Sequence, residues 1–459
     1  MERISIECIA QWTGGELIGD KASSWISSIC TDSRVLKAGD CFVALKGKNF
    51  DGVDFVPDAV RKGAAAVIVD RIQPDFGPLA VPVIKVKDTL KALQNIALFY
   101  RKELGAKIIA ITGSSGKTST KEMVGSVLRQ KYKTVCTSGN FNNQIGLPLS
   151  LLQMDKTTEY GVFELGTNHP GEIATLSRIT APDIVIVTNI GSAHVGNFGS
   201  VEALAQEKTD LLTFVSARGF AILSTDDFWS KRLHVRSAGR VIWVGNQQNS
   251  LCWLDRIEIT QRGIRFGICR RKEKFEVCLP TVSREMAKNS LFAAAVGFLS
   301  SLSSEEITRG LEKTSFPEGR LTVHPIKNGF VMDDSYNANP QSMRSALRAL
   351  VEYPFSSKKI VVLGSMGELG DKARAYHFEV GSFAGGLPLA HVILVGPYGE
   401  DVYEGLRSSS FPIDCIFRTA DTEEAFFYLH KLLSGNVTVL VKGSRFLKLD
   451  MIVKKLLCL

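Results

Sequence analysis

The chain has 459 residues, of which 45% are hydrophobic, and a formal net charge of +8 at pH 7. This length predicts about three domains, and the longest apolar runs, such as Ala64–Val69 and Leu291–Val296, are far too short to cross a bilayer, so we expect no membrane insertion. The positive charge suits polyanionic small molecules as well as nucleic acid, but no basic–aromatic block or DNA-binding motif is present, so we expect no nucleic-acid partner.

The first segment, Met1–Cys8, lacks the basic and apolar stretches of an export signal, and the nine cysteines lack metal-site spacing. We therefore expect a cytoplasmic protein with reduced thiols. The first predicted domain covers residues 1–85. It contains predicted strands at 40–45, 66–69 and 83–86, a helix near 55–62 and a loop at 73–78.

The second predicted domain covers residues 86–316. It opens with a helix, Thr89–Glu103, and closes with another, Lys288–Leu302. Between them we expect strands at 107–111, 160–165 and 183–188, an amphipathic helix at 201–214, and a less regular β-rich part at 241–244, 256–259, 265–269 and 274–278.

The third predicted domain covers residues 317–459 and follows a turn at Phe316–Arg320. Its strands, expected at 359–364, 391–396 and 437–443, are apolar runs that end in glycine, as buried parallel strands often do. The alternation of strands and helices predicts an α/β fold: a small N-terminal domain, a central domain with a mostly parallel sheet, and a Rossmann-like, doubly wound C-terminal domain.

The most informative motif is the phosphate loop between the apolar strand at 107–111 and the next helix. Gly113 and Gly116 let backbone N–H groups close on phosphate oxygens, Lys117 supplies a positive charge, and the Thr118 hydroxyl is placed for Mg²⁺ at a helix N-terminus. An ordinary Gly/Ser turn is the alternative. The nucleotide contacts of this loop are predicted at Thr112, Gly113, Ser114, Ser115, Gly116, Lys117, Thr118 and Ser119.

Polar residues follow two further central strands, at the edge where ligands gather in parallel sheets. Glu164 and His194 are candidate Mg²⁺ ligands or neighbours of such ligands. Glu164 could instead cap the following helix, and His194 could be an ordinary loop histidine. Lys208 lies on the amphipathic helix after His194, where the pattern alone favours a solvated lysine paired with Glu207 or Asp210.

The third domain opens with a dense polar segment, Asp333–Pro340, after an apolar strand. Polar clusters on loops are more often functional than structural. Asn339 is also a reasonable N-cap, since Pro340 would stand at the first helical position. Arg320 and the turn Lys442–Arg445 are further candidates for binding anions.

The chain resembles the Mur ligase superfamily over nearly its whole length. The resemblance rests on TDSR at 31–34, GDCFVALKG at 39–47, TGSSGKTST at 112–120, GNFNNQIGLP at 139–148, FELGTNHPGEI at 163–173, TNIGSAHVGNFG at 188–199, DDSYNANP at 333–340 and KGSR at 442–445. It implies an ATP-dependent amide ligase of peptidoglycan precursor synthesis, acting through an acyl phosphate. The implied substrates are UDP-N-acetylmuramoyl-tripeptide and D-alanyl-D-alanine, and we expect a monomer.

The resemblance also implies roles for individual residues. Lys117, His194 and Lys208 would be catalytic; Thr118 and Glu164 would hold one Mg²⁺, and His194 a second together with a carbamylated Lys208. Asn289, Arg320 and Asp334 would contact ATP, and the substrate-binding residues would be Ser33, Arg34, Lys46, Asn140, Tyr336 and Asn337. The alternatives are another Mur-type ligase, a folylpolyglutamate synthase, or a catalytically idle nucleotide-binding partner of the cell-wall machinery.

Overall fold

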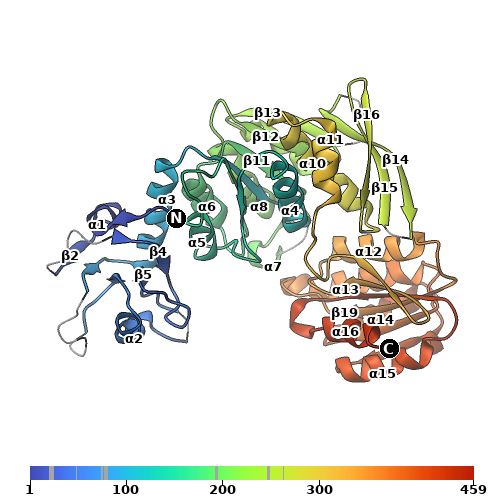
Figure 1. The fold of residues 1–459 in the computed structure, drawn as a ribbon. Helices are drawn as coiled ribbons and strands as arrows, with labels where there is room; N and C mark the ends of the chain where they lie inside the picture. Colours follow the sequence, from blue (N-terminus) through green and yellow to red (C-terminus); the bar gives the residue numbers. More distant parts are fainter. Residues whose placement is uncertain are drawn as a thin grey trace.

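The computed structural model describes residues 1–19, 25–47, 49–73, 76, 81–191, 195–245, 249–261 and 263–459. Figure 1 shows three lobes in chain order, each built around its own sheet. The α/β fold class and the mostly parallel sheets expected from the sequence are confirmed. Most of the predicted loop at 73–78 lies outside the described residues.

The N-terminal lobe holds a five-stranded sheet in the order β2-β7-β6-β5-β4, in which only β2 runs antiparallel to its neighbour. A two-stranded sheet, β1 with β3, lies beside it. The strands and helices here are β1 (Ile4–Ser5), α1 (Ile6–Thr13), β2 (Glu16–Ile18), β3 (Trp25–Ile26), β4 (Ser28–Cys30), β5 (Asp40–Val43), α2 (Val56–Arg61), β6 (Ala66–Val69), β7 (Val83–Lys85) and α3 (Thr89–Glu103).

The central lobe holds a nine-stranded sheet in the order β16-β15-β14-β13-β12-β11-β8-β10-β9, parallel from β9 to β14 and antiparallel beyond. Its strands are β8 (Lys107–Thr112), β9 (Thr134–Cys136), β10 (Tyr160–Glu164), β11 (Ile184–Val187), β12 (Phe220–Ser224), β13 (Arg240–Gly245), β14 (Cys252–Thr260), β15 (Gly263–Arg270) and β16 (Glu273–Leu279). Its helices are α4 (Lys117–Leu128), α5 (Gly146–Leu151), α6 (Glu172–Thr180), α7 (Val195–Phe198), α8 (Val201–Thr209), α9 (Phe228–Leu233), α10 (Arg284–Leu299) and α11 (Ser304–Glu312).

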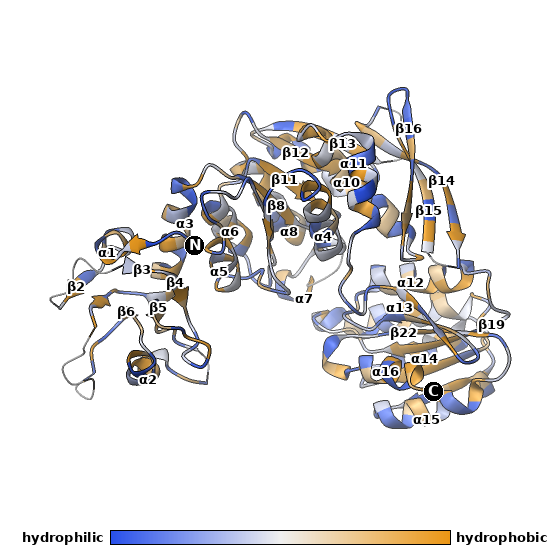
Figure 2. Ribbon diagram, in the orientation of Figure 1, coloured by the Kyte–Doolittle hydropathy of each residue, from blue (hydrophilic) through white to orange (hydrophobic). Residues whose placement is uncertain are grey.

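The strand β8 is buried on both faces, and its side chains divide between two cores. Ile109 and Ile111 belong to the core that includes residues of α4, α10 and α11, whereas Ile108 and Ala110 belong to the core of α3, α5 and α6. Alternation of side chains along a strand produces this division. Figure 2 shows the hydrophobic residues concentrated on the strands of the sheets.

The C-terminal lobe holds a six-stranded sheet in the order β17-β18-β22-β19-β20-β21, parallel except for the pair β17–β18. Its strands are β17 (Thr322–Ile326), β18 (Gly329–Asp334), β19 (Lys358–Gly364), β20 (His391–Val395), β21 (Ile416–Thr419) and β22 (Val437–Lys442), and its helices are α12 (Pro340–Glu352), α13 (Ala373–Gly385), α14 (Gly399–Ser408), α15 (Thr422–Leu432) and α16 (Asp450–Leu457). Asn339 caps α12, as the sequence suggested: its side chain accepts a hydrogen bond of 2.8 Å from Ser342 N.

Two predicted helices differ from the observed ones. The helix expected at 288–302 is α10, which begins at Arg284 and ends at Leu299. The helix expected at 201–214 ends at Thr209 and continues as a 3₁₀ turn, Asp210–Phe214. Helix ends depend on caps and on tertiary packing, which the periodic pattern does not contain.

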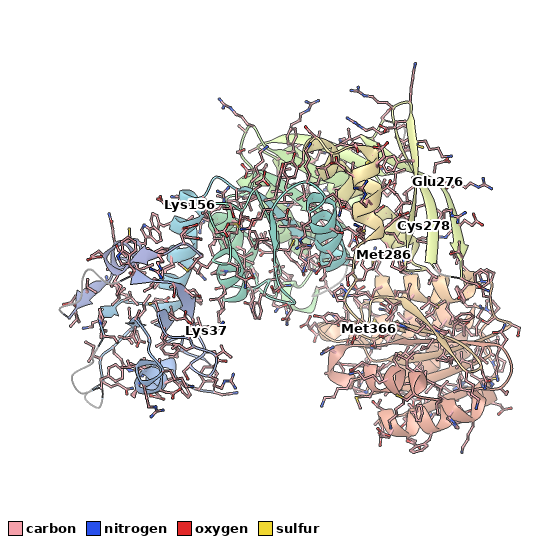
Figure 3. All side chains as sticks on the ribbon, viewed as in Figure 1. Lys37, Lys156, Glu276, Cys278, Met286 and Met366 are labelled. Carbon is pink, nitrogen blue, oxygen red and sulfur yellow. The ribbon has the colours of Figure 1, made fainter. Side chains whose placement is uncertain are left out.

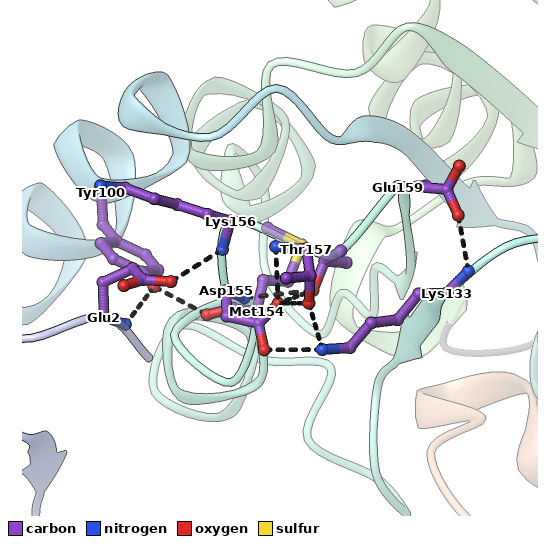
Figure 4. Close-up of polar contacts among 9 residues, drawn as sticks. Glu2, Tyr100, Lys133, Met154, Asp155, Lys156, Thr157 and Glu159 are labelled. Carbon is purple, nitrogen blue, oxygen red and sulfur yellow. Dashed lines mark hydrogen bonds and ion pairs between the residues drawn. The ribbon is translucent and has the colours of Figure 1, made fainter.

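The helix α3 joins the N-terminal and central lobes, because its apolar side chains share one core with residues of both. Figure 4 shows a polar contact at the same junction. The Tyr100 hydroxyl donates to Met154 O at 2.7 Å and accepts from Glu2 N at 2.8 Å, and Lys156 N donates to the Glu2 carboxylate at 3.0 Å. The start of the chain is thereby held against the central lobe. Within the described residues, no helix is both long and apolar enough to span a membrane.

Candidate active site

The phosphate loop has the backbone geometry that its glycines predict. Gly113 has φ +147° and Gly116 has φ +80°, values that L side chains rarely adopt. A Cβ at Gly113 would meet the Thr188 hydroxyl at 1.9 Å, and one at Gly116 would meet the Asn289 side-chain amide at 2.6 Å. The loop therefore requires glycine at both positions for conformation and for space.

Lys117 opens helix α4 and reaches back over the loop, where its ammonium donates to Gly113 O at 2.8 Å. Burial lowers the pKa of Lys117, and the nearby carboxylates of Glu164 and Glu368 oppose that shift. A cation held over a glycine-rich turn at a helix N-terminus is suited to bind the terminal phosphates of a nucleotide.

Thr118 and Glu164 meet as the phosphate-loop motif predicts. The Thr118 hydroxyl donates to one Glu164 oxygen at 2.8 Å, and the Asn142 side-chain amide donates to the other at 2.9 Å. The alternative in which Glu164 caps the next helix is wrong, because the N-terminal backbone of α6 is held by Glu207, which accepts from Ile173 N at 2.8 Å. Asn142 lies in the motif at 139–148, but no separate role was predicted for its side chain.

Thr188 and Asn189, which directly follow β11, form hydrogen bonds with the phosphate loop, and no separate role was predicted for either. The Thr188 hydroxyl donates to Ser115 O at 2.7 Å. The Asn189 side chain accepts from Ser115 N at 3.1 Å and donates to Ser115 O at 3.0 Å. These contacts preorganise the phosphate loop without a ligand.

The solvated-lysine interpretation of Lys208 is wrong. Its side chain is 1% exposed, Glu207 is engaged with α6, and Asp210 pairs with Arg236. Burial and the nearby Lys117 hold the pKa of Lys208 well below its usual range, against the attraction of Glu207 and Glu164. Lys208 therefore belongs to a group of interacting charges with Lys117, Glu164 and Glu207 next to the phosphate loop.

His194, the other predicted residue of this region, lies outside the described residues.

A cavity of about 590 Å³ lies between the central and C-terminal lobes, in front of the phosphate loop. Figure 3 shows Met286, which lines this cavity, at the junction of the two lobes. Thirteen of the residues predicted for the site line the cavity: Ser114, Ser115, Gly116, Lys117, Thr118, Ser119, Asn140, Glu164, Asn289, Arg320, Asp334, Tyr336 and Asn337. Side chains from regions more than 200 residues apart in the sequence thus meet at one cavity.

Arg320 crosses the junction of the two lobes. Its guanidinium lies 4.1 Å from the centre of the Tyr336 ring and donates to the Thr118 hydroxyl at 3.4 Å. Its Nε is buried without a hydrogen-bond partner in the described structure. Arg320 is thus held by stacking, with donor capacity left for an anion.

Lys442 and Arg445, from the turn predicted to bind anions, both line the cavity, and Lys442 is also held within the protein. Its ammonium is buried and donates to the Asp334 carboxylate at 2.6 Å and to Asn337 O at 3.1 Å. Because Asp334 and Lys442 are register partners on β18 and β22, their pairing follows from the strand order. One Asp334 oxygen is therefore engaged within the protein, while the residue still lines the cavity.

Three predicted substrate residues lie apart from this cavity, in the N-terminal lobe. Ser33 and Arg34 follow β4, and Lys46 follows the adjacent parallel strand β5, so they lie at one edge of the sheet. Arg34 forms a two-point ion pair with Asp32, which lowers the pKa of that carboxyl to about 2.

Thr112, a predicted nucleotide contact at the end of β8 in the central lobe, is buried, and its hydroxyl donates a hydrogen bond to Leu165 O at 3.0 Å.

Three family models match the chain. They describe the Mur ligase family, catalytic domain (residues 25–101), the Mur ligase middle domain (111–297) and the Mur ligase, glutamate ligase domain (319–445). A relative named UDP-N-acetylmuramoyl-tripeptide–D-alanyl-D-alanine ligase from Escherichia coli is 34% identical over 99% of each chain.

Solved structures of proteins named MurF have the same fold as this chain. A crystal structure of MurF from Acinetobacter baumannii has a TM-score of 0.92 at 31% identity and covers 100% of this chain and 99% of that one. MurF from Thermotoga maritima in complex with ADP has a TM-score of 0.83 at 27% identity, covering 93% and 96%.

The fold and the site define a nucleotide-binding α/β protein of three lobes with its reaction cavity at a lobe junction, and the chain belongs to the Mur ligase family. The similarity extends over the whole chain to the UDP-N-acetylmuramoyl-tripeptide–D-alanyl-D-alanine ligases, so the resemblance inferred from the sequence is confirmed.

Proposed function

We propose that this enzyme uses ATP to join D-alanyl-D-alanine to the tripeptide of UDP-N-acetylmuramoyl-tripeptide, a step of peptidoglycan precursor synthesis. The observation that carries the proposal is the cavity in which Lys117, Thr118 and Glu164 of the central lobe face Arg320 and Tyr336. The full-length similarity to ligases of this name supports the choice of substrates over another Mur-type ligase, a folylpolyglutamate synthase or an idle protein.

The reaction needs activation because a carboxylate is a poor acyl donor. The terminal carboxylate of the tripeptide attacks the γ-phosphate of ATP, forming a C–O–P link and releasing ADP. The dipeptide amine then attacks the acyl carbon, the C–O bond to phosphate breaks, inorganic phosphate leaves with the electron pair, and the nitrogen loses its proton to water. Lys117 and Arg320 are placed to hold the phosphates in line and to offset the charge that develops on them.

The residues of the phosphate loop fit a magnesium ion. The Thr118 hydroxyl and the Glu164 carboxylate supply two converging oxygens 2.8 Å apart, and Mg²⁺ prefers one or two protein oxygens together with phosphate and water. In the described parts of the chain, no three His, Cys, Asp or Glu side chains form a ready-made metal site. When bound with ATP, the ion would neutralise charge on the phosphate oxygens.

We also propose that His194 and a carbamylated Lys208 hold a second Mg²⁺. An ammonium repels a metal ion, but a carbamate formed from the neutral amine and CO₂, with loss of one proton, is an oxygen ligand. The burial that lowers the pKa of Lys208 favours the neutral amine that this reaction requires. Protein equilibrated with ¹³C-bicarbonate should show a carbamate carbon in its NMR spectrum that Lys208→Arg lacks, and identical spectra would contradict the carbamylation.

The remaining sites are assigned by position. We propose that Ser33, Arg34 and Lys46 hold the uridine diphosphate end of the substrate, that Asn140 borders the peptide, and that Asn289, Arg320 and Asp334 contact ATP. Tyr336 and Asn337 would then face the dipeptide, on the opposite wall of the cavity from the phosphate loop. We propose a cytoplasmic monomer, which size-exclusion chromatography with light scattering can check.

Release of phosphate from ATP tests the function. The enzyme should release phosphate with UDP-N-acetylmuramoyl-tripeptide and D-alanyl-D-alanine together, and little with either alone. Release driven by single amino acids or by a folate would favour the other ligases. No release with any acceptor would favour an idle nucleotide-binding protein.

A further inference from the structure

The loop after β19, residues 365–370, brings a carboxylate from the C-terminal lobe to the reaction cavity. Met366 and Leu369 are buried at 1% and 2% exposure, whereas Glu368 between them is exposed and lines the cavity. Lys117 of the central lobe lines the same cavity. Glu368 therefore faces the phosphate loop across the junction of the lobes.

This loop is held in place by hydrogen bonds. Met366 N donates to the buried His377 ring at 2.8 Å, and Gly367 N donates to the Ser444 hydroxyl at 2.9 Å. Figure 3 labels Met366 beside the junction of the lobes. Burial lowers the pKa of His377, which keeps the ring neutral and able to accept this hydrogen bond.

The loop also touches the central lobe directly. A Cβ at Gly370 would meet Gly196 Cα, on helix α7, at 2.8 Å. The backbones at Gly370 and Gly196 can lie this close together because neither residue has a side chain. This contact holds the loop that carries Glu368 against the central lobe.

Glu368 has φ +62°, in the left-handed region that glycine occupies freely. An L residue there is strained, because its Cβ approaches the following carbonyl oxygen. The neighbouring positions 367 and 370 are glycines, so the loop contains residues suited to turns, yet a glutamate stands at the strained position. Strain that the surroundings hold in place is a reason to look for a role of the side chain.

The acceptor substrate supplies a chemical reason for a carboxylate here. A dipeptide reaches the enzyme with an ammonium group, which needs a carboxylate partner in the cavity. The cavity is lined by the cations Lys117, Arg320, Lys442 and Arg445 and by the carboxylates Glu164, Glu172, Glu285, Asp334 and Glu368, of which Asp334 and Glu368 belong to the C-terminal lobe. The other cavity carboxylate of the C-terminal lobe, Asp334, is paired with the buried Lys442. A carboxylate has about four acceptor sites, so Glu368 can bind an ammonium whatever else it contacts.

We propose that Glu368 binds the amino group of the acceptor dipeptide and holds it beside the acyl phosphate. This inference rests on the proposed function. The carboxylate attracts the ammonium form into the cavity and then stabilises the positive charge that the nitrogen gains as it bonds to the acyl carbon. The bound ammonium first loses one proton to water, which frees the lone pair of the nitrogen. The neutral amine then attacks the acyl carbon, the C–O bond to phosphate breaks, phosphate leaves with the electron pair, and the nitrogen loses a second proton to water as the amide forms.

The test compares a charged acceptor with an uncharged one. Hydroxylamine is mostly uncharged at neutral pH and converts an acyl phosphate to a hydroxamate. In Glu368→Gln, the KM for D-alanyl-D-alanine should rise about 10- to 100-fold, as expected for loss of a charged hydrogen bond, while the KM values for ATP and the nucleotide substrate change less than about 2-fold. Hydroxamate formation should continue at close to the wild-type rate.

Two further variants complete the test. Glu404→Gln removes an exposed carboxylate of the same lobe, paired with Arg407, and should leave every constant unchanged. Glu368→Gly relieves the backbone strain, so it should melt no lower than the wild type and still show the raised KM for the dipeptide.

An unchanged dipeptide KM in Glu368→Gln would overturn the assignment. So would an equal loss of hydroxamate formation, because Glu368 would then act on the acyl phosphate and not on the amine. Absence of hydroxamate with the wild-type enzyme would overturn the proposed function and this inference with it.

Discussion

Replacing Lys117 by alanine should remove nearly all turnover, to about 1% of the wild-type rate or less, and leave the fold intact. Among the residues that the structure describes, the ammonium hydrogen-bonds to Gly113 O, and loss of this bond costs about 1 kcal/mol. Against this, Lys117 is a partly buried cation whose pKa is lowered by desolvation, so its removal also relieves an unfavourable desolvation. The two effects oppose each other, and the melting temperature should change little.

The effect on the reaction should be much larger. A preorganised donor aimed at charge that develops in the transition state contributes about 2.7–4 kcal/mol, which corresponds to a loss of about 10²–10³-fold in kcat. Phosphate release measures the rate, and thermal unfolding measures the fold. Lys107→Ala is the matched control, because this exposed lysine stands at the opposite end of the same strand, β8.

Activity within about 10-fold of the wild type in Lys117→Ala would refute the phosphate role, given the magnitude expected above. Lys117→Met, which keeps most of the side-chain volume, guards against a folding defect. If Lys117→Ala unfolds but Lys117→Met is folded and active, the residue serves the fold and the reasoning fails.

Two other predictions concern the C-terminal lobe. Asp334→Asn leaves the buried Lys442 without a counter-charge, so denaturant unfolding of this lobe should show a loss of about 3–5 kcal/mol, largely restored in Asp334→Asn/Lys442→Met; a loss below about 0.5 kcal/mol would contradict the buried ion pair. Burial lowers the pKa of Lys359 to about 8 from 10.5, so between these values the unfolded state binds more protons and the free energy of unfolding should rise with pH. Lys359→Met should lack this rise, and parallel pH profiles for the two proteins would contradict the assignment.

The phosphate loop could be predicted from the sequence because its information is local. The strand, the glycines and Lys117 are contiguous, and each has a physical reason to be there. Glu164 could also be predicted, although it lies 46 residues from Thr118, because parallel strands end at the same edge of a sheet.

Other parts of the site depend on information that is not local. The solvated interpretation of Lys208 follows from its helix pattern, and only tertiary packing buries it behind the phosphate loop. The pair of Asp334 with Lys442 depends on the order of β18 and β22 in their sheet. The approach of Glu368 to Lys117 depends on how two lobes meet, and its positive φ leaves no mark on the sequence.

The most direct test of the account follows oxygen through the reaction. If the tripeptide carboxylate attacks ATP at the cavity of Lys117, Thr118 and Glu164, substrate labelled with ¹⁸O in that carboxylate should pass one labelled oxygen to each phosphate released, detected by mass spectrometry. Unlabelled phosphate, released while the amide product forms, would contradict an acyl phosphate and with it the central claim.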